Sequence, residues 1–147
     1  MGLFDFARNI GKKIFGKSDD DDKASEKLQS HIEDDNPGVK GLKVTVKDGV
    51  ATVKGKAKTA SAYEKAVLMA GNALGIEEVR ADELDAPKQT VDVTYYEVAK
   101  GDSLWKIAKK FYGSGAKYTA IFEENREVIK DPDMIFPGQK IRSPMDE

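Results

Sequence analysis

Residues 42–55 read LKVTVKDGVATVKG, two runs of alternating apolar and polar side chains on either side of Asp48-Gly49. Alternation with a period of two is typical of a β-strand that buries one face, and an Asp-Gly pair between two such runs favours a type I′ hairpin turn. This turn places Val46 opposite Ala51 on the apolar face. Because a two-stranded hairpin is marginal alone, we expect a helix to cover that face.

Helical patterns lie on both sides of the hairpin. An apolar stripe over residues 24–32 predicts a helix that ends at Asn-Pro-Gly, residues 36–38. A second stripe runs over residues 61–74 and opens with a Ser-x-x-Glu capping box. Residues 76–84 alternate imperfectly, as expected of a bulged third strand. We therefore predict a compact α/β module over residues 24–85.

The chain before this module has two parts. Residues 1–17 show apolar side chains at helical spacing with basic ones opposite, which predicts an amphipathic helix. Such a helix packs on the neighbouring module or lies on a membrane surface; we favour packing. Residues 18–23, SDDDDK, lack the alternating ligands of an EF-hand and are interpreted as an acidic linker.

The last third of the chain has a different pattern. Residues 86–93, around Pro87, are interpreted as a linker. Residues 94–147 then predict a strand, a helix capped by Asp102 and closed by Gly113, a second helix that ends at residues 131–132, and a final short strand. The predicted fold class is α+β, with two small domains, the second of order β-α-α-β.

Composition excludes several classes of function. The 147 residues carry a formal charge of -2 and no cysteine, so disulfides, thiolate metal sites and cysteine nucleophiles are absent. No apolar run approaches the about 20 residues of a membrane-spanning helix, and charged residues interrupt every N-terminal apolar stretch. We expect a cytoplasmic monomer with no nucleic-acid partner and no membrane insertion.

An enzyme is also disfavoured. His31 is the only histidine, so neither a catalytic triad nor a zinc site has visible partners. No spacing of acidic residues singles out an acid/base pair for glycoside cleavage. The sequence is interpreted as a binding protein without catalysis.

Three strings in the C-terminal half carry a resemblance to a known family. In order, YEVAKGDSLWKIAKKFYG, IFEENR and DPDMIFPGQKIRSP resemble a LysM domain. The preceding helix, hairpin with VKDGVATVKG, helix and strand resemble a BON domain. The two together, after an N-terminal MGLF, resemble the bacterial potassium-binding proteins. The resemblance implies a cytoplasmic sensor or buffer that binds K⁺ with the BON module and the N-terminal segment.

Main-chain oxygens are the ligands that the chemistry of K⁺ requires. A large monovalent cation is held by several neutral carbonyls, and helix C-termini present carbonyls without intrahelical partners at the negative end of the dipole. Glycines mark two such places, residues 7–12 and residues 71–76. The alternative is that the glycines at 71 and 75 only form a helix cap and a turn. The resemblance implies carbonyl ligands at Ala7, Ile10, Lys12, Gly71, Ala73 and Ile76.

A different class of function stays open for the LysM-like part. It could recognise peptidoglycan or other N-acetylglucosamine polymers, or hold an unknown protein partner. We expect instead that it stabilises or reports the K⁺-bound state. The candidate ligand loops for a glycan contain Gly101, Asp102, Ser103, Asp131 and Ile135.

Overall fold

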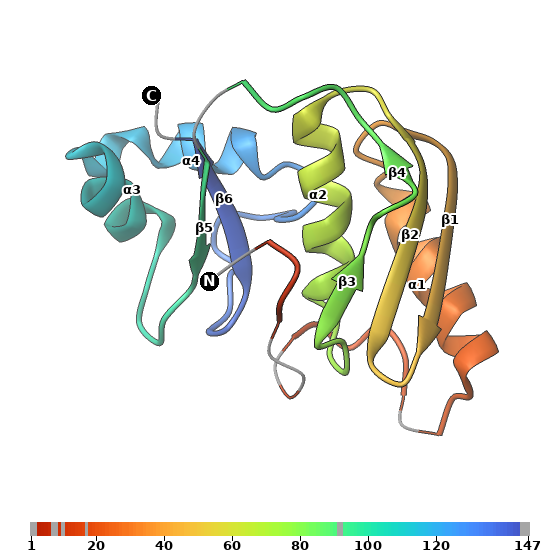
Figure 1. Cartoon of the computed structure of the whole chain (residues 1–147). Coiled ribbons are helices and arrows are strands. Elements are labelled where there is room, and N and C mark those ends of the chain that lie inside the picture. The colour runs from red at the N-terminus through yellow and green to blue at the C-terminus, as the bar shows by residue number, and fades with distance from the viewer. Residues whose placement is uncertain (1–2, 7–8, 10, 17, 91–92, 145–147) are drawn as a thin grey trace.

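The computed structural model describes residues 3–6, 9, 11–16, 18–90 and 93–144, and within them the chain forms two α+β modules side by side (Figure 1). The second module begins at β5 (Val93–Glu97), and its two strands form a sheet of their own. The first module consists of α1 (Asp21–Asp34), β1 (Val39–Lys47), β2 (Val50–Ala57), α2 (Ala60–Gly71), β3 (Glu78–Arg80) and β4 (Leu84–Asp85).

The β1-β2 hairpin has the predicted register. Val46 pairs with Ala51, and Asp48 and Gly49 adopt φ angles of 49° and 80°, as a type I′ turn requires. The predicted third strand is instead two short strands, β3 and β4, which both run parallel to β2. Between them, three steps along β2 (Thr52 to Gly55) face four steps from Arg80 to Leu84, and the Gly55 N–H donates to the Glu83 carbonyl at 3.3 Å. The irregularity predicted within residues 76–84 is this extra residue, which divides the edge into two short strands.

Helix α1 begins inside the stretch that the sequence assigns to the acidic linker. The carboxylate of Asp20 accepts a hydrogen bond from the Lys23 backbone N–H at 2.8 Å and caps the helix. Asp21 and Asp22 therefore lie in the first turn, where their negative charge is favourable near the helix N-terminus.

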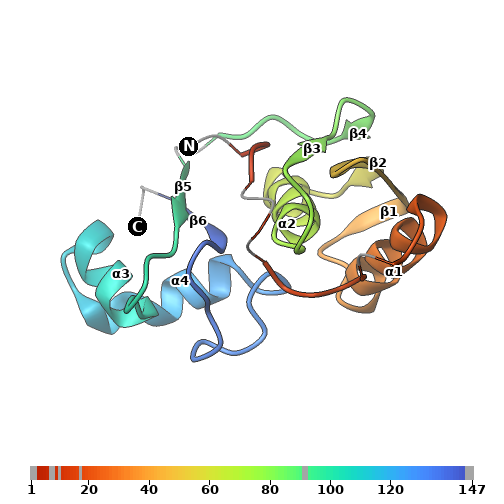
Figure 2. The ribbon, with the colours of Figure 1, turned by 90° about the horizontal axis from the view of Figure 1, so that it is seen from below.

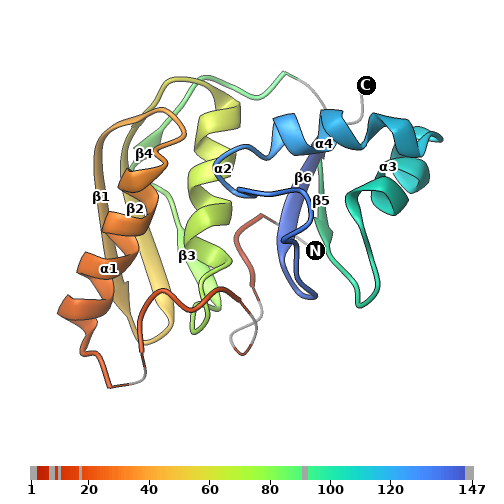
Figure 3. The same ribbon diagram turned by 180° about the vertical axis from the view of Figure 1, so that it is seen from behind.

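Helix α2 lies between the four-stranded sheet and the second module (Figures 1 and 3). Its N-cap is Thr59, whose hydroxyl accepts from the Ala62 N–H at 2.9 Å, rather than the predicted Ser61. Residues 66–71 are all buried, because one face of the helix packs on the sheet and the other on the second module. A helix that is apolar all round requires this central position.

The second module has the predicted β-α-α-β order, with antiparallel β5 and β6. Its helix α3 is capped by Ser103 instead of Asp102, and Gly113 closes it in the left-handed conformation at φ 77°. Helix α4 ends at Glu124, earlier than predicted. The residue that follows it, buried Asn125, bonds the backbone N–H and carbonyl of Arg142 in β6 with its side-chain amide. The elements are β5 (Val93–Glu97), α3 (Leu104–Tyr112), a 3-10 turn η1 (Gly115–Lys117), α4 (Tyr118–Glu124) and β6 (Lys140–Pro144).

The N-terminal segment, residues 3–6, 9 and 11–16, is not helical as far as the structure describes it. It runs across one end of α2 toward the start of α1 (Figures 2 and 3). Its backbone makes isolated β-bridges, Asp5 with Glu78 and Lys12 with Ala73. The predicted helix is wrong for these residues, because their polar backbone groups bond to the first module rather than to each other. No helix in the described ranges is long and apolar enough to cross a membrane.

Candidate functional site

The N-terminal segment meets the chain as it leaves α2, in a stretch that we call the exit turn (residues 71–76). The Lys12 N–H donates to the Asn72 carbonyl at 2.8 Å, and the Leu74 N–H donates to the Lys12 carbonyl at 2.9 Å. A second crossing lies further along, where the Phe6 N–H donates to the Glu77 carbonyl at 3.0 Å. Two stretches about sixty residues apart in the sequence are thus joined backbone to backbone.

Two glycines permit this close approach. A Cβ at Gly11 would lie 2.5 Å from the Asn72 carbonyl oxygen, and one at Gly71 would lie 2.1 Å from the Phe6 ring. Gly75 has a φ of 102°, which side chains other than glycine rarely adopt. The glycines therefore do more than cap a helix, since they let the N-terminal segment touch the exit turn.

Of the described members of the predicted ligand set, the structure places Lys12 beside Ala73. Gly71 and Ile76 lie two residues before and three residues after Ala73 along the chain. Ala7 and Ile10 lie outside the described residues. The carbonyls of Lys12 and Ala73 each accept one hydrogen bond, from Leu74 and Ile76 N–H, and each oxygen keeps a second lone pair.

The end of α2 contributes a potential that favours a cation at the exit turn. The exit turn begins at the last residue of α2, where the helix dipole is negative and the last carbonyls lack intrahelical partners. Among the described residues, the carbonyls of Gly71 and Ile76 accept no backbone hydrogen bond outside the regular elements. These two oxygens join those of Lys12 and Ala73 as uncharged candidate ligands.

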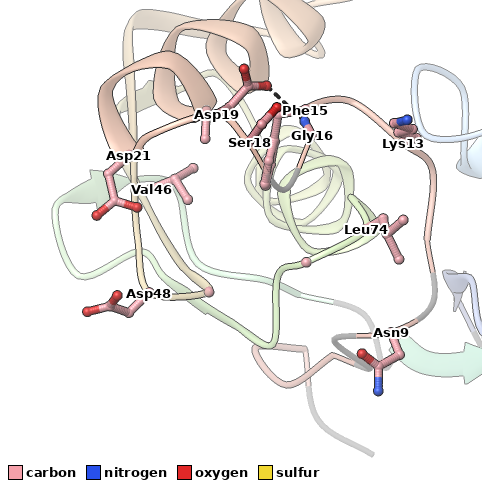
Figure 4. Close-up of a pocket in the computed structure, with 13 residues that line it drawn as sticks. Asn9, Lys13, Phe15, Gly16, Ser18, Asp19, Asp21, Val46, Asp48 and Leu74 are labelled. Atoms are coloured by element: carbon pink, nitrogen blue, oxygen red, sulfur yellow. Dashed lines mark hydrogen bonds between the residues drawn. The ribbon is translucent and has the colours of Figure 1, made fainter.

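An open cleft of about 1060 Å³ borders the exit turn (Figure 4). Leu74 and Gly75 form one wall, and the side chains of Asp19, Asp21 and Asp48 lie around it. A hydrogen bond from the Lys27 ammonium is the main cause that lowers the pKa of Asp19 below its usual value. The cleft gives water and ions a path to the exit turn past ionised carboxylates.

A smaller cavity of about 30 Å³ lies on the other side, lined among others by Lys12, His31, Asn72 and Ala73. Its volume is that of about one water molecule in the liquid. Burial lowers the pKa of His31 below its ordinary value, and the positive charges of Lys12 and Lys130 lower it further. His31 is thus a half-buried imidazole beside the candidate site, in surroundings that favour its neutral form.

This pKa shift predicts a loss of stability in acid. As the pH falls through about 6.5, the unfolded chain protonates His31 before the folded chain does, so the free energy of unfolding decreases until the lowered folded-state pKa is passed. Urea midpoints measured at about pH 7.5 and 5.5 will therefore fall more for the native protein than for H31Q. Equal decreases in the two proteins would contradict the prediction.

The second module is attached to the exit turn by a side chain that the sequence did not single out. The Asn72 amide donates to the Lys140 carbonyl and accepts from the Lys140 N–H, both at 2.8 Å. Next along β6, buried Arg142 bonds Glu64 of α2 at 2.9 Å and Glu124 of α4 at 2.7 Å. The one available signal was the alternation of two long cations on either side of Ile141 in the predicted strand.

The candidate glycan loops are each held by hydrogen bonds of their own. The Asp102 carboxylate accepts from the Tyr96 hydroxyl at 2.5 Å and from the Ala99 N–H at 2.8 Å. Ser103 caps α3, and Asp131 accepts from the Asp133 N–H at 2.9 Å. The remaining two, exposed Gly101 and half-buried Ile135, complete the loops. Glycan binding there stays a prediction.

Known proteins share both modules. The family model of the BON domain matches residues 20–86, and that of the LysM domain matches residues 96–144. The potassium binding protein Kbp of Escherichia coli O6:H1 is 36% identical over 149 residues, which cover 98% of this chain and 99% of that protein. The chain belongs to the Kbp family.

Other relatives share only part of this Kbp family member. An uncharacterised protein of Deinococcus radiodurans is 47% identical over 60 residues, 41% of this chain and 22% of that protein. The uncharacterised protein YqbP of Bacillus subtilis is 41% identical over 58 residues, 33% of this chain and 26% of that protein.

Within the described ranges, no three histidine, aspartate or glutamate side chains are grouped as metal ligands.

Proposed function

We propose that this chain binds K⁺ through main-chain carbonyls where the N-terminal segment meets the exit turn, and acts in the cytoplasm as a sensor or buffer of the ion. The observation that carries the proposal is the pairing of Lys12 with Asn72 and Leu74, which gathers backbone oxygens at the negative end of α2. The potassium-binding relative of nearly equal length supports it.

The ligand chemistry supports a monovalent ion. Carbonyl oxygens supply partial charge without net charge, which suits K⁺, whereas Ca²⁺ sites are built with carboxylates. The proposed set is Ala7, Ile10, Lys12, Gly71, Ala73 and Ile76, six oxygens in all. Lys12 contributes its carbonyl only, and its side chain is exposed to water.

The LysM module has a structural role in this proposal. Asn72 belongs to the exit turn, and its amide bonds the backbone of Lys140 in β6. Ordering of the exit turn by K⁺ therefore favours docking of LysM, and docking favours the ordered exit turn. The module stabilises or reports the K⁺-bound state.

Calorimetric titration with KCl and with NaCl at constant ionic strength tests the function. We expect saturable heat with K⁺ and little with Na⁺, together with compaction measured by small-angle scattering. Equal responses to the two salts would remove the proposal, because a carbonyl site selects between these ions and general screening does not.

Hydrogen exchange tests where the ion binds. In K⁺ the amides of Lys12 and Leu74, which bond across the site, should exchange more slowly than in Na⁺. The amide of Val44, in the β1-β2 hairpin, serves as the internal control because it bonds the Gln29 side chain at 3.0 Å and does not line the cleft beside the exit turn. If protection of residues 3–15 is the same in both salts, the ion does not order this segment.

Gly75 provides a test by substitution. Valine at φ 102° is strained by about 1–2 kcal/mol, and relief of that strain would turn the exit-turn carbonyls away from the ion. G75V should therefore weaken K⁺ binding by about tenfold in calorimetry. The matched control is G41V, because Gly41 also has positive φ, 65°, with no atom within 4 Å of a new Cβ. Equal affinity of G75V and G41V would show that Gly75 does not shape the site.

A further inference from the structure

Lys140 of LysM is a buried cation at the edge of the proposed site. Its residue is 1% exposed, and its ammonium donates to the Asp5 carbonyl of the N-terminal segment. The same ammonium lies 4.3 Å from the centre of the Phe6 ring. The Lys140 ammonium, itself a monovalent cation, is thus held by a main-chain carbonyl and an aromatic face.

Two independent links tie this ammonium to the exit turn. First, the Asn72 side-chain amide bonds both the N–H and the carbonyl of Lys140. The backbone carbonyl of Asn72 in turn accepts from the Lys12 N–H. Second, the Phe6 ring that faces the ammonium also fills the space in front of Gly71. A single aromatic ring therefore separates the ammonium from the first residue of the exit turn.

Two carboxylates act on the charge of Lys140. Burial lowers the pKa of the ammonium below its ordinary value, and the carboxylates of Asp5 and Glu97 act in the opposite direction. The Asp5 residue is exposed, so water screens much of its effect. An ammonium has the charge of K⁺ and takes the same carbonyl ligands, so it is suited to oppose K⁺ at a neighbouring carbonyl set.

We infer that Lys140 sets the affinity of the site, as a tethered positive charge against which K⁺ must bind. The inference rests on the proposed function. Docking of LysM through Asn72 orders the exit turn. It also places the Lys140 ammonium near the exit turn, and this positive charge raises the electrostatic potential there. A sensor responds only at ion concentrations close to its dissociation constant, so the charge of Lys140 moves that range to higher K⁺ concentrations.

The test is the full-length K140M variant, titrated with KCl at constant ionic strength. Methionine keeps an unbranched stem against Phe6 and removes the charge. Across one aromatic ring, loss of a unit charge in a partly buried place should tighten K⁺ binding by about tenfold. K140R, which keeps the charge, should bind K⁺ nearly as the native protein does.

The matched control is K110M. Lys110 also lies over an aromatic ring, 5.0 Å from the centre of Tyr96, but on α3 of LysM. Its removal should leave K⁺ affinity unchanged. Unchanged or weaker binding by K140M would overturn the inference, because it would make Lys140 a docking anchor only. If K140M does not fold, as judged by circular dichroism, K140Q takes its place with the same expected direction.

Failure of the proposed K⁺ binding and failure of the inference about Lys140 give different results. Absence of K⁺ binding by the native protein would remove the proposed function and the inference together. Binding by the native protein without tightening in K140M would remove only the inference. Tighter binding by both K140M and K110M would also overturn it, since the effect would then follow from total charge and not from the place of Lys140.

Discussion

Replacing Arg142 with methionine will lower the free energy of unfolding by about 3–5 kcal/mol. The guanidinium and its partner Glu64 are nearly fully buried, with side chains 2% and 5% exposed. Methionine fills most of the volume but leaves the Glu64 carboxylate without its cation, at the interface between α2 and LysM. An uncompensated buried charge is far more costly than the loss of an exposed ion pair.

The measurement is urea unfolding followed by two probes. Trp105, the only tryptophan, lies on α3 and reports the LysM module, whereas far-ultraviolet circular dichroism reports both modules. In the native protein the two transitions should coincide, because the buried pair couples the modules. In R142M the tryptophan transition should shift to lower urea and separate from the other.

The control is R80M, which removes an arginine from an exposed pair. Arg80 and Glu78 side chains are 61% and 40% exposed, so this loss should cost less than about 1 kcal/mol. The double variant E64L/R142M should recover much of the stability, since the one carboxylate left without Arg142, that of Glu124, is partly exposed to water. If R142M and R80M are equally stable, the buried pair does not hold the modules together.

The local parts of the fold follow from the sequence. Alternation around Asp48-Gly49 gives both the strands and the turn, because turn conformation and register depend on neighbouring residues. The same holds for α3, which ends at Gly113 as predicted. Errors of one or two residues occur where capping side chains compete, as with Thr59 and Ser61.

The N-terminal segment shows where sequence reasoning fails. A helical period describes which side chains are apolar, but an extended segment can bury the same side chains. Leu3 is buried, and Phe6 and Ile14 pack against the core, although the segment crosses α2 as a non-helical chain. Bridges to residues distant in sequence decide its conformation, and local periodicity contains no information about them.

The candidate site was foreseen only in part. Glycines at 71 and 75 indicated a special backbone, but their pairing with Lys12 came from the resemblance and not from periodicity. Asn72 lies between two proposed ligands, and its sequence neighbours do not show that its amide bonds LysM. Lys140 resembles any lysine of an edge strand until the fold places Asp5 and Phe6 around it. Such contacts join residues more than sixty positions apart.

Replacing Gly11 with alanine will weaken K⁺ binding by about 100-fold, equivalent to the loss of two backbone hydrogen bonds. A Cβ at this position would lie 2.5 Å from the Asn72 oxygen and 2.7 Å from the Leu74 nitrogen. Both atoms belong to the backbone and cannot move aside as a flexible side chain would. The Lys12 bonds to the exit turn must therefore break, and the Lys12 carbonyl leaves the proposed ligand set.

The first module should still fold in G11A, because most of its hydrophobic core lies in α1, α2 and the sheet, to which the N-terminal segment adds Leu3. Calorimetry with KCl gives the affinity, and circular dichroism with the urea midpoint gives the state of that core. G41A is the control, since Gly41 has a φ of 65° and a new Cβ there meets nothing within 4 Å. The substitution G11A separates the N-terminal segment from the exit turn. If G11A nevertheless binds K⁺ as tightly as G41A does, the carbonyl oxygens that hold the ion are not those that these two stretches bring together.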